Sequence, residues 1–225
     1  MATIADLRRR AYRRRMNDVN AGDDDEGLLV RNLSSAVICE MSLSLGRGQG
    51  RAIVGPSGSG KTSLFRALAD LDPNEGEVVV NGTARAVIAP AEWRRRVAYV
   101  PAEPAWWLPT AGDHADAAAR RIATDLGLTE KVLEKPVSAL STGERQRLAL
   151  AVAFAREPEV LLLDEPTSAL DEDNRDDVET AILDRLKTGT VMLIASHDRR
   201  QVERLGLEIV HIADGRIVDA PDIGA

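Results

Sequence analysis

A glycine-rich run of eight residues carries the strongest chemical signal in the sequence. It reads Gly55-Pro56-Ser57-Gly58-Ser59-Gly60-Lys61-Thr62 and follows the apolar run Arg51–Val54. Glycines at this spacing let the backbone wrap closely around phosphate groups, with its N–H groups facing the phosphate oxygens. The pattern predicts that Lys61 reaches the β- and γ-phosphates of a nucleoside triphosphate and that the Thr62 hydroxyl binds Mg²⁺. A glycine-rich turn without a ligand is the alternative.

Two carboxylates at the end of another apolar run are the second signal. Asp164 and Glu165 directly follow Val160–Leu163. Ligands of open α/β sheets bind at the carboxyl ends of the strands, so we expect both acids beside the phosphate loop. Asp164 is predicted to hold Mg²⁺ through water, and Glu165 to orient and deprotonate the water that attacks the γ-phosphate. A solvated turn is the alternative interpretation.

The sequence has three histidines, and one of them lies at a strand end. His197 follows the apolar run Val191–Ala195, where an imidazole can contact the γ-phosphate and report its presence. His114 lies in a polar stretch and is predicted to be exposed. His211 lies within an apolar run and is predicted to be an ordinary core or surface residue. Neither has neighbours with metal-ligand spacing.

Apolar runs of two kinds must position these residues. Some read as strands of an antiparallel layer: Leu28–Leu33, Ala36–Leu45 and Val78–Val80. Others read as strands buried on both faces: Arg51–Val54, Val97–Val100, Val160–Leu163 and Val191–Ala195. Helical patterns follow three of the buried runs: Lys61–Leu71, Asn174–Leu186 and Arg199–Leu205. Alternation of buried strands and helices predicts an α/β fold with a mostly parallel sheet.

A third motif, Leu140-Ser141-Thr142-Gly143-Glu144, precedes an alanine-rich helical stretch, the acidic strand and Ser168-Ala169-Leu170-Asp171. Taken in this order with the phosphate loop, the motifs resemble those of the ATP-binding-cassette (ABC) ATPases, whose signature is typically Leu-Ser-Gly-Gly-Gln. The resemblance covers about residues 28–218. It implies a P-loop NTPase core with a mostly parallel sheet, an antiparallel β layer and a short helical subdomain at about 104–145.

The same resemblance implies a division of labour between two copies of the chain. Ser141, Gly143 and Glu144 would contact an ATP held by the phosphate loop of the opposite subunit, and Asp171 would help couple the two sites. A helix N-terminus at this motif suits phosphate. Two chains would then enclose two ATP molecules in a two-fold homodimer, with Mg²⁺ as the metal. The partner would be an integral membrane permease, and the location would be cytoplasmic, peripheral on the inner face of the cell membrane.

Three departures from the family pattern bear on activity. The family usually carries a metal-binding glutamine after the strand that corresponds to Val97–Val100, where this sequence has Ala102 and then Glu103. Glu103 is the candidate substitute as a metal contact. No aromatic residue follows the first strand to stack on adenine, which an aliphatic contact could replace. The helical subdomain is short, with Trp106 and Trp107 at its start, where the family docks a helix of the membrane subunit; a buried core pair is the alternative.

Composition limits the remaining classes. The chain has 225 residues, a net charge of −7 and 44% hydrophobic residues, as in an ordinary globular protein. No basic excess indicates a nucleic-acid partner, and no apolar run reaches the length of a membrane span. The lone Cys39 indicates a reducing compartment. Residues 1–27 form a charged N-terminal extension, either partly disordered or in contact with lipid headgroups or a partner, and residues 28–225 form the ABC ATPase domain.

Two alternatives to a transporter ATPase remain at this point. A soluble ABC protein that acts outside a transporter would normally bring two cassettes, a coiled coil or a long linker, and the sequence shows none. A regulatory module that closes on ATP but hydrolyses it poorly is the other alternative, motivated by Ala102. A measured turnover rate separates the second alternative from a transporter subunit.

Overall fold

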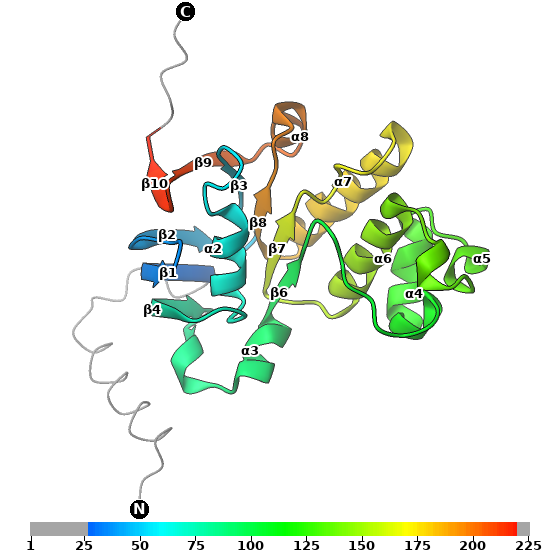
Figure 1. The fold of residues 1–225 in the computed structure, drawn as a ribbon, viewed down its shortest axis with the longest axis horizontal. Helices are drawn as coiled ribbons and strands as arrows, with labels where there is room; N and C mark the ends of the chain where they lie inside the picture. The colour runs from blue at the N-terminus through cyan, green and yellow to red at the C-terminus, as the bar shows by residue number, and fades with distance from the viewer. Residues whose placement is uncertain (1–26, 220–225) are drawn as a thin grey trace, which may run out of the picture.

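Two β-sheets with helices between and beside them form the part of the chain that the computed structural model describes, residues 27–219. Figure 1 shows the smaller sheet on one side of helix α2 (Lys61–Leu68) and the larger sheet on its other side. The predicted N-terminal extension lies, apart from Gly27, outside the described residues. No helix within residues 27–219 is long and apolar enough to cross a membrane.

The smaller sheet is antiparallel, as the sequence predicts. Its strands lie in the order β2-β1-β4-β5, with bounds Met41–Gly46, Gly27–Ser35, Asn74–Val80 and Thr83–Ala84. The predicted strand Ala36–Leu45 is wrong in its first half, because residues 36–40 form a turn. The Ser35 hydroxyl accepts hydrogen bonds from the N–H groups of Val37 and Ile38, at 3.3 and 3.1 Å, and so turns the chain before β2.

The larger sheet is mostly parallel and contains all four strands that the sequence predicts to be buried. Its order is β10-β9-β3-β8-β7-β6. The strands span Arg216–Val218, Glu208–Ala213, Gly50–Val54, Val191–Ala195, Val160–Asp164 and Val97–Val100. Only the terminal pair β9–β10 is antiparallel among the described strands of this sheet. This topology confirms the predicted P-loop NTPase core.

Alternate residues of the buried strands pack into two separate cores. On β7, Val160 and Leu162 join the core that contains α2 and the antiparallel sheet. Leu161 and Leu163 join the core on the other face, with the helices that carry Ala119, Leu148 and Val178. Successive side chains of a strand point to opposite faces, so a strand covered on both sides must be apolar at every position. The four apolar residues Val160–Leu163 of β7 are fully buried for this reason, and the buried Asp164 follows at the carboxyl end of the strand.

Seven helices connect these strands within the described residues. Besides α2 they are α3 (Pro90–Arg96), α4 (Ala117–Asp125), α5 (Glu130–Leu133), α6 (Thr142–Ala155), α7 (Glu172–Lys187) and α8 (Arg199–Arg204). Residues 104–145 contain only α4, α5, two single 3₁₀ turns and the first turn of α6. Figure 1 shows α4, α5 and α6 together on the side of the larger sheet away from α2. These helices form a short helical subdomain, and its predicted bounds of about 104–145 stay a prediction.

Helix α2 ends three residues earlier than the predicted Lys61–Leu71. Asp70 has a backbone φ of 56°, a left-handed conformation that cannot continue a helix. Arg66 also binds Asp72 through two short hydrogen bonds of 2.7 and 2.6 Å, which fold the chain back along the last helical turn. These contacts outweigh the helical periodicity of the sequence.

Candidate functional site

The phosphate loop joins the end of β3 to the start of α2, as predicted. The Lys61 ammonium donates hydrogen bonds to the carbonyl oxygens of Gly55 and Pro56, at 2.8 and 3.0 Å. Gly60 has a φ of 107°, which a glycine adopts without strain. A Cβ atom on Gly55 would lie 2.1 Å from the Ile212 carbonyl oxygen. The loop therefore requires glycine at both positions to bring its backbone into this curve.

The middle of the loop faces solvent, whereas its end is anchored. Ser57 and Gly58 are exposed, and the Pro56 carbonyl accepts a hydrogen bond from the Ser59 N–H at 3.2 Å. Ser59 is buried, and its carbonyl accepts from the Gly215 N–H at 3.0 Å. The exposed backbone in front of α2 is the arrangement that binds phosphate at helix N-termini.

Asp164 meets the phosphate loop at the carboxyl edge of the sheet. Thr62 Oγ1 donates a hydrogen bond of 2.7 Å to Asp164 Oδ2, and the Tyr99 hydroxyl donates to the same oxygen at 3.2 Å. Burial, together with the negative charge of Asp164, raises the pKa of Tyr99, so its hydroxyl stays protonated as a donor. Strand register explains the meeting, because Ile53 and Asp164 both pair with Ala195 at the end of β8.

The donor set at this edge fits Mg²⁺. Thr62 and Asp164 present a hydroxyl and a carboxylate, and magnesium prefers such oxygen ligands while retaining waters and substrate phosphates. Residues 27–219 contain no group of three or more His, Cys, Asp or Glu side chains that could hold a metal ion by themselves. A metal here would need waters or phosphate oxygens as further ligands. The site can therefore hold magnesium together with a phosphate ligand.

Glu165 and His197 form a direct pair. His197 Nδ1 lies 2.9 Å from Glu165 Oε2, and the side chains are 77% and 20% exposed, respectively. Glu165 has a backbone φ of 49°, and its N–H donates to the Ala195 carbonyl at 2.9 Å, which holds β7 and β8 together just beyond their ends. Strained backbone of this kind persists where its surroundings determine it, often at functional sites. The pair offers a carboxylate and an exposed imidazole beside the phosphate loop.

The third motif caps the N-terminus of α6. Ser141 Oγ accepts from the Glu144 N–H at 3.1 Å, and Glu144 Oε2 accepts from the Ser141 N–H at 2.7 Å, which completes a capping box. Within residues 27–219 the Ser141 hydroxyl donates to no acceptor, so its hydrogen can be donated to a ligand. Glu144 Oε1 also accepts from Lys135 Nζ at 3.0 Å. These donors, the Ser141 N–H first, lower the pKa of Glu144, and Lys135 balances its charge.

Gly143 and Asp171 lie in segments that touch each other. A Cβ atom on Gly143 would approach the Ala169 carbonyl oxygen to 2.9 Å, so the motif packs closely on the segment before Asp171. Asp171 caps α7, and its Oδ1 accepts from the Asn174 N–H at 3.0 Å. This hydrogen bond lowers the pKa of Asp171, which keeps it ionised. Both residues are therefore placed on one surface beside α6 and α7.

Glu103 lies apart from the metal-binding oxygens. Its side chain is exposed and lines a groove of about 640 Å³ with Trp106 and Trp107. In the described part of the chain, Glu103 forms no hydrogen bond or ion pair with Thr62 or Asp164. The geometry gives its metal role no support, and that role stays a prediction.

Trp106 and Trp107, which line this groove, both pack against His114. The rings of Trp106 and Trp107 lie edge-on to the His114 ring, with centroid distances of 4.8 and 5.0 Å. His114 Nε2 accepts a hydrogen bond from the Leu108 N–H at 3.0 Å. The prediction of an exposed His114 is therefore wrong, because two tryptophan rings half-bury it. Trp107 itself is 78% exposed, which excludes a buried tryptophan pair.

Sequence reasoning missed the contacts that Tyr99, Lys135 and Val37 make with the predicted site. A tyrosine within the otherwise aliphatic β6 was the available signal for Tyr99. Lys135 gave no signal, because its partner Glu144 is reached only through the fold. Val37 is 44% exposed, and its Cγ1 would lie 3.5 Å from a Cβ on Gly60, so it borders the end of the phosphate loop.

Comparison with known proteins shows which family this chain resembles. The family model described as "ABC transporter" matches residues 38–168. The lipoprotein-releasing system ATP-binding protein of Maricaulis maris is 38% identical over 199 residues, which cover 78% of this chain and 85% of that protein. Protein STAR1 of rice, Oryza sativa subsp. japonica, is 35% identical over 193 residues, or 80% of this chain. The chain spans only 56% of the length of that rice relative.

A solved structure shows the same fold. It is a dimeric ATP-binding cassette in a post-hydrolysis state, bound to ADP and phosphate. The TM-score is 0.75 at 22% identity, and the match covers 88% of this chain and 99% of that one. At this identity the likeness establishes the architecture of the two sheets and their helices.

Proposed function

The chain belongs to the ABC transporter family and carries an ATPase domain of that family, and we propose that two copies close around two ATP molecules to drive transport through a separate membrane permease. We assign this domain to residues 28–225. The placement of α2 and α6 is the observation that carries the proposal. They pack on opposite faces of the larger sheet (Figure 1), so the motif at α6 does not cover the phosphate loop of its own chain. A second chain can supply it.

ATP hydrolysis follows from the residues at the carboxyl edge of the sheet. The loop Gly55–Thr62 binds the phosphates, and Thr62 and Asp164 would hold Mg²⁺, which neutralises phosphate charge when it is bound. Glu165 takes a proton from water as that water attacks the γ-phosphorus and ADP leaves from the opposite side. His197, held by Glu165 through Nδ1, presents Nε2 to the γ-phosphate.

The two halves of the dimer meet through ATP. The Ser141 hydroxyl can donate its hydrogen to a phosphate oxygen, and the N-terminus of α6 suits a phosphate supplied by the partner chain. Lys135 offsets the charge of Glu144, which would otherwise repel that phosphate. Asp171 lies on the same surface as Ser141 and Gly143 and would couple the two ATP sites of the dimer. Loss of the γ-phosphate removes these contacts, so hydrolysis favours opening of the dimer.

The groove beside Trp107 is the proposed docking site for the permease. An exposed tryptophan above an apolar floor is typical of the residues that dominate binding energy at interfaces. The cytoplasmic face of the cell membrane is the corresponding location, and no nucleic acid is expected as a partner.

Replacing Trp107 with alanine tests this docking. We expect the tagged wild-type chain to co-purify from detergent-solubilised membranes with a multi-span membrane protein that mass spectrometry identifies. The W107A variant should recover about tenfold less of it, because truncated interface tryptophans cost about 2 kcal/mol or more. Ile209→Ala, at another exposed apolar residue, is the matched control. Equal recovery with all three chains would contradict docking in the groove.

Base selectivity is the second property that the site predicts. Val37 is the exposed side chain beside the phosphate loop where the family places an aromatic residue, and an aliphatic side chain cannot stack on adenine. ATP and GTP should therefore bind with dissociation constants within about tenfold of each other, and Val37→Tyr should tighten ATP binding up to about tenfold. Titration calorimetry measures both, with Ile209→Tyr as a control. An ATP preference above a hundredfold in the wild type would overturn this assignment.

A further inference from the structure

Helix α8 starts two residues after His197, with Asp198 as its N-cap, and therefore helps to set the position of His197. It has only six residues, of which Gln201 and Val202 are buried. A helix this short is not stable by itself. Its buried face consists only of Gln201 and Val202, which is too small to hold the helix in place by packing alone. The position of the His197 segment therefore depends on the polar contacts that α8 makes with the rest of the fold.

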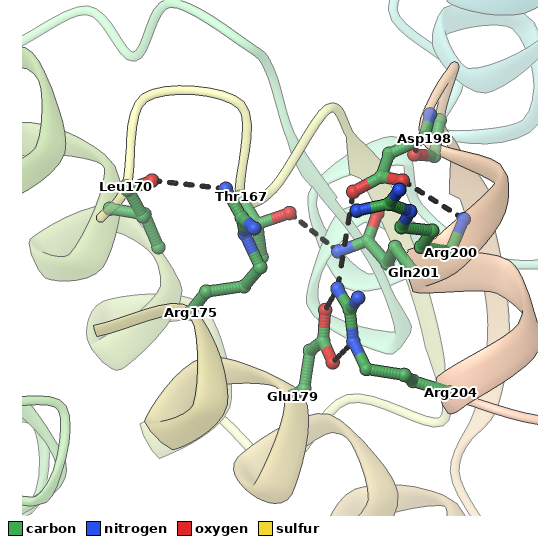
Figure 2. Close-up of polar contacts among 9 residues, drawn as sticks. Thr167, Leu170, Arg175, Glu179, Asp198, Arg200, Gln201 and Arg204 are labelled. Atoms are coloured by element: carbon green, nitrogen blue, oxygen red, sulfur yellow. Dashed lines mark hydrogen bonds and ion pairs between the residues drawn. The ribbon is translucent and has the colours of Figure 1, made fainter. Parts of the chain in front are cut away.

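One such contact is a buried hydrogen bond between two side chains. Gln201 Nε2 donates to Thr167 Oγ1 at 2.6 Å, and the two residues are 1% and 4% exposed. Figure 2 shows Gln201 reaching from α8 to Thr167 in the segment before α7. Both side chains are shielded from solvent, so the bond lies behind the exposed His197 and not on the surface that would meet a nucleotide. Loss of one partner would leave the other unpaired in a dry environment.

The two ends of this bond flank the pair that faces the nucleotide. Thr167 lies two residues after Glu165, and Gln201 lies four residues after His197. A second link ties α8 to α7, where Arg204 donates two hydrogen bonds of 2.7 Å to the buried Glu179 (Figure 2). That link fixes the far end of α8, whereas the bond between Gln201 and Thr167 fixes the end near His197.

We propose that Gln201 and Thr167 are positioning residues for ATP hydrolysis, which hold His197 Nδ1 against Glu165 Oε2 through their buried hydrogen bond. This inference rests on the proposed roles of Glu165 and His197. A hydrogen bond is directional and sets the separation of the two segments, whereas an apolar contact of the same size leaves them free to slide. When the bond is lost, the 2.9 Å contact between His197 and Glu165 loosens. The attacking water is then placed less well.

Thr167→Val and Gln201→Met remove the bond and keep the side-chain volumes. In each variant kcat for ATP hydrolysis should fall about tenfold, because misplacement by about an ångström costs up to about a hundredfold. KM for ATP should stay the same, since both side chains are buried and the phosphate loop is unchanged. Thr167→Ser keeps the hydroxyl and should restore kcat to near the wild-type value.

The double variant T167V/Q201M separates positioning from stability. It leaves no unpaired polar group, so its melting temperature should recover toward that of the wild type, whereas kcat should stay about tenfold low. Arg96→Met is the matched stability control, because it breaks a partly buried pair with Glu159 at the opposite end of β7. It should lower the melting temperature by a few degrees, as loss of a partly buried ion pair does in a chain of this size, and leave kcat unchanged.

Three outcomes would overturn the inference, and they differ in what else they affect. If Thr167→Val keeps full kcat while Glu165→Gln is inactive, the inference fails and the proposed function stands. If kcat of the double variant recovers with its melting temperature, the bond serves stability alone. If Glu165→Gln and His197→Ala both hydrolyse ATP at the wild-type rate, the proposed roles fail and this inference fails with them.

Discussion

Replacing Lys61 with alanine is expected to weaken ATP binding by a factor of a hundred or more. Its ammonium lies 2.8 and 3.0 Å from the carbonyl oxygens of Gly55 and Pro56, which places a full positive charge inside the loop that receives the phosphates. Lys61 is expected to bond the β- and γ-phosphates of ATP. Hydrogen bonds to charged groups contribute about 1.5–3 kcal/mol each, so loss of two such bonds to phosphate corresponds to roughly a hundredfold or more in affinity. Titration calorimetry with ATP and Mg²⁺ measures this change.

Lys187→Ala provides the control for this first prediction. Lys187 pairs with Asp184 on the surface of α7, with side-chain exposures of 73% and 62%. Its removal takes the same charge from the chain without touching the loop, so ATP affinity should not change. An unchanged affinity of the K61A variant would contradict the phosphate-loop assignment.

Glu165→Gln is expected to lower the rate of ATP hydrolysis about a thousandfold, within the range that general-base groups contribute. The amide keeps the shape of the carboxylate and its contact with His197 but cannot take a proton from water. ATP binding should persist, because the phosphate loop is unchanged. Single-turnover phosphate release and ATP titration measure the two effects separately.

Glu130→Gln is the matched control for the second prediction, since Glu130 lies in α5, with a side chain that is 66% exposed. A wild-type chain that itself hydrolyses ATP no faster than E165Q would instead favour a regulatory module that binds ATP without turnover. Ala102, in place of the usual metal-binding glutamine, makes this outcome worth measuring first.

The buried strands and the phosphate loop were the parts of the fold most accessible from the sequence. β3, β6, β7 and β8 are apolar at almost every position, a pattern that has few structural explanations other than a sheet covered on both faces. The loop motif binds its ligand largely through the backbone, so its spacing alone predicts its location between β3 and α2. Asp164 and His197 then follow, because parallel strands bring their carboxyl ends to one edge.

Local pattern was insufficient where distant side chains decide the outcome. The turn at residues 36–40 depends on the Ser35 hydroxyl, and α2 ends where Arg66 binds Asp72. Both segments keep an apolar spacing that favours a longer element. His114 reads as an exposed polar residue, yet Trp106 and Trp107 enclose it once the chain folds.

Support for the site depends on contacts between residues far apart in the chain. Tyr99 reaches Asp164 across adjacent strands, and Gln201 reaches Thr167 from a helix that follows β8. No local motif encodes these pairs, because each depends on sheet order. Glu103 shows the converse case, since its place next to the expected glutamine position does not bring it into contact with Thr62 or Asp164 in the described residues, and its metal role stays a prediction.

The mass of the Glu165→Gln variant in solution, measured by light scattering with ATP and Mg²⁺, tests the central claim most directly. A variant that binds ATP without hydrolysing it keeps the γ-phosphate contacts that would join two chains. We predict twice the mass of the 24.3 kDa chain with ATP and a single chain with ADP. A mass of one chain at saturating ATP would contradict the proposal that two copies share the nucleotide sites.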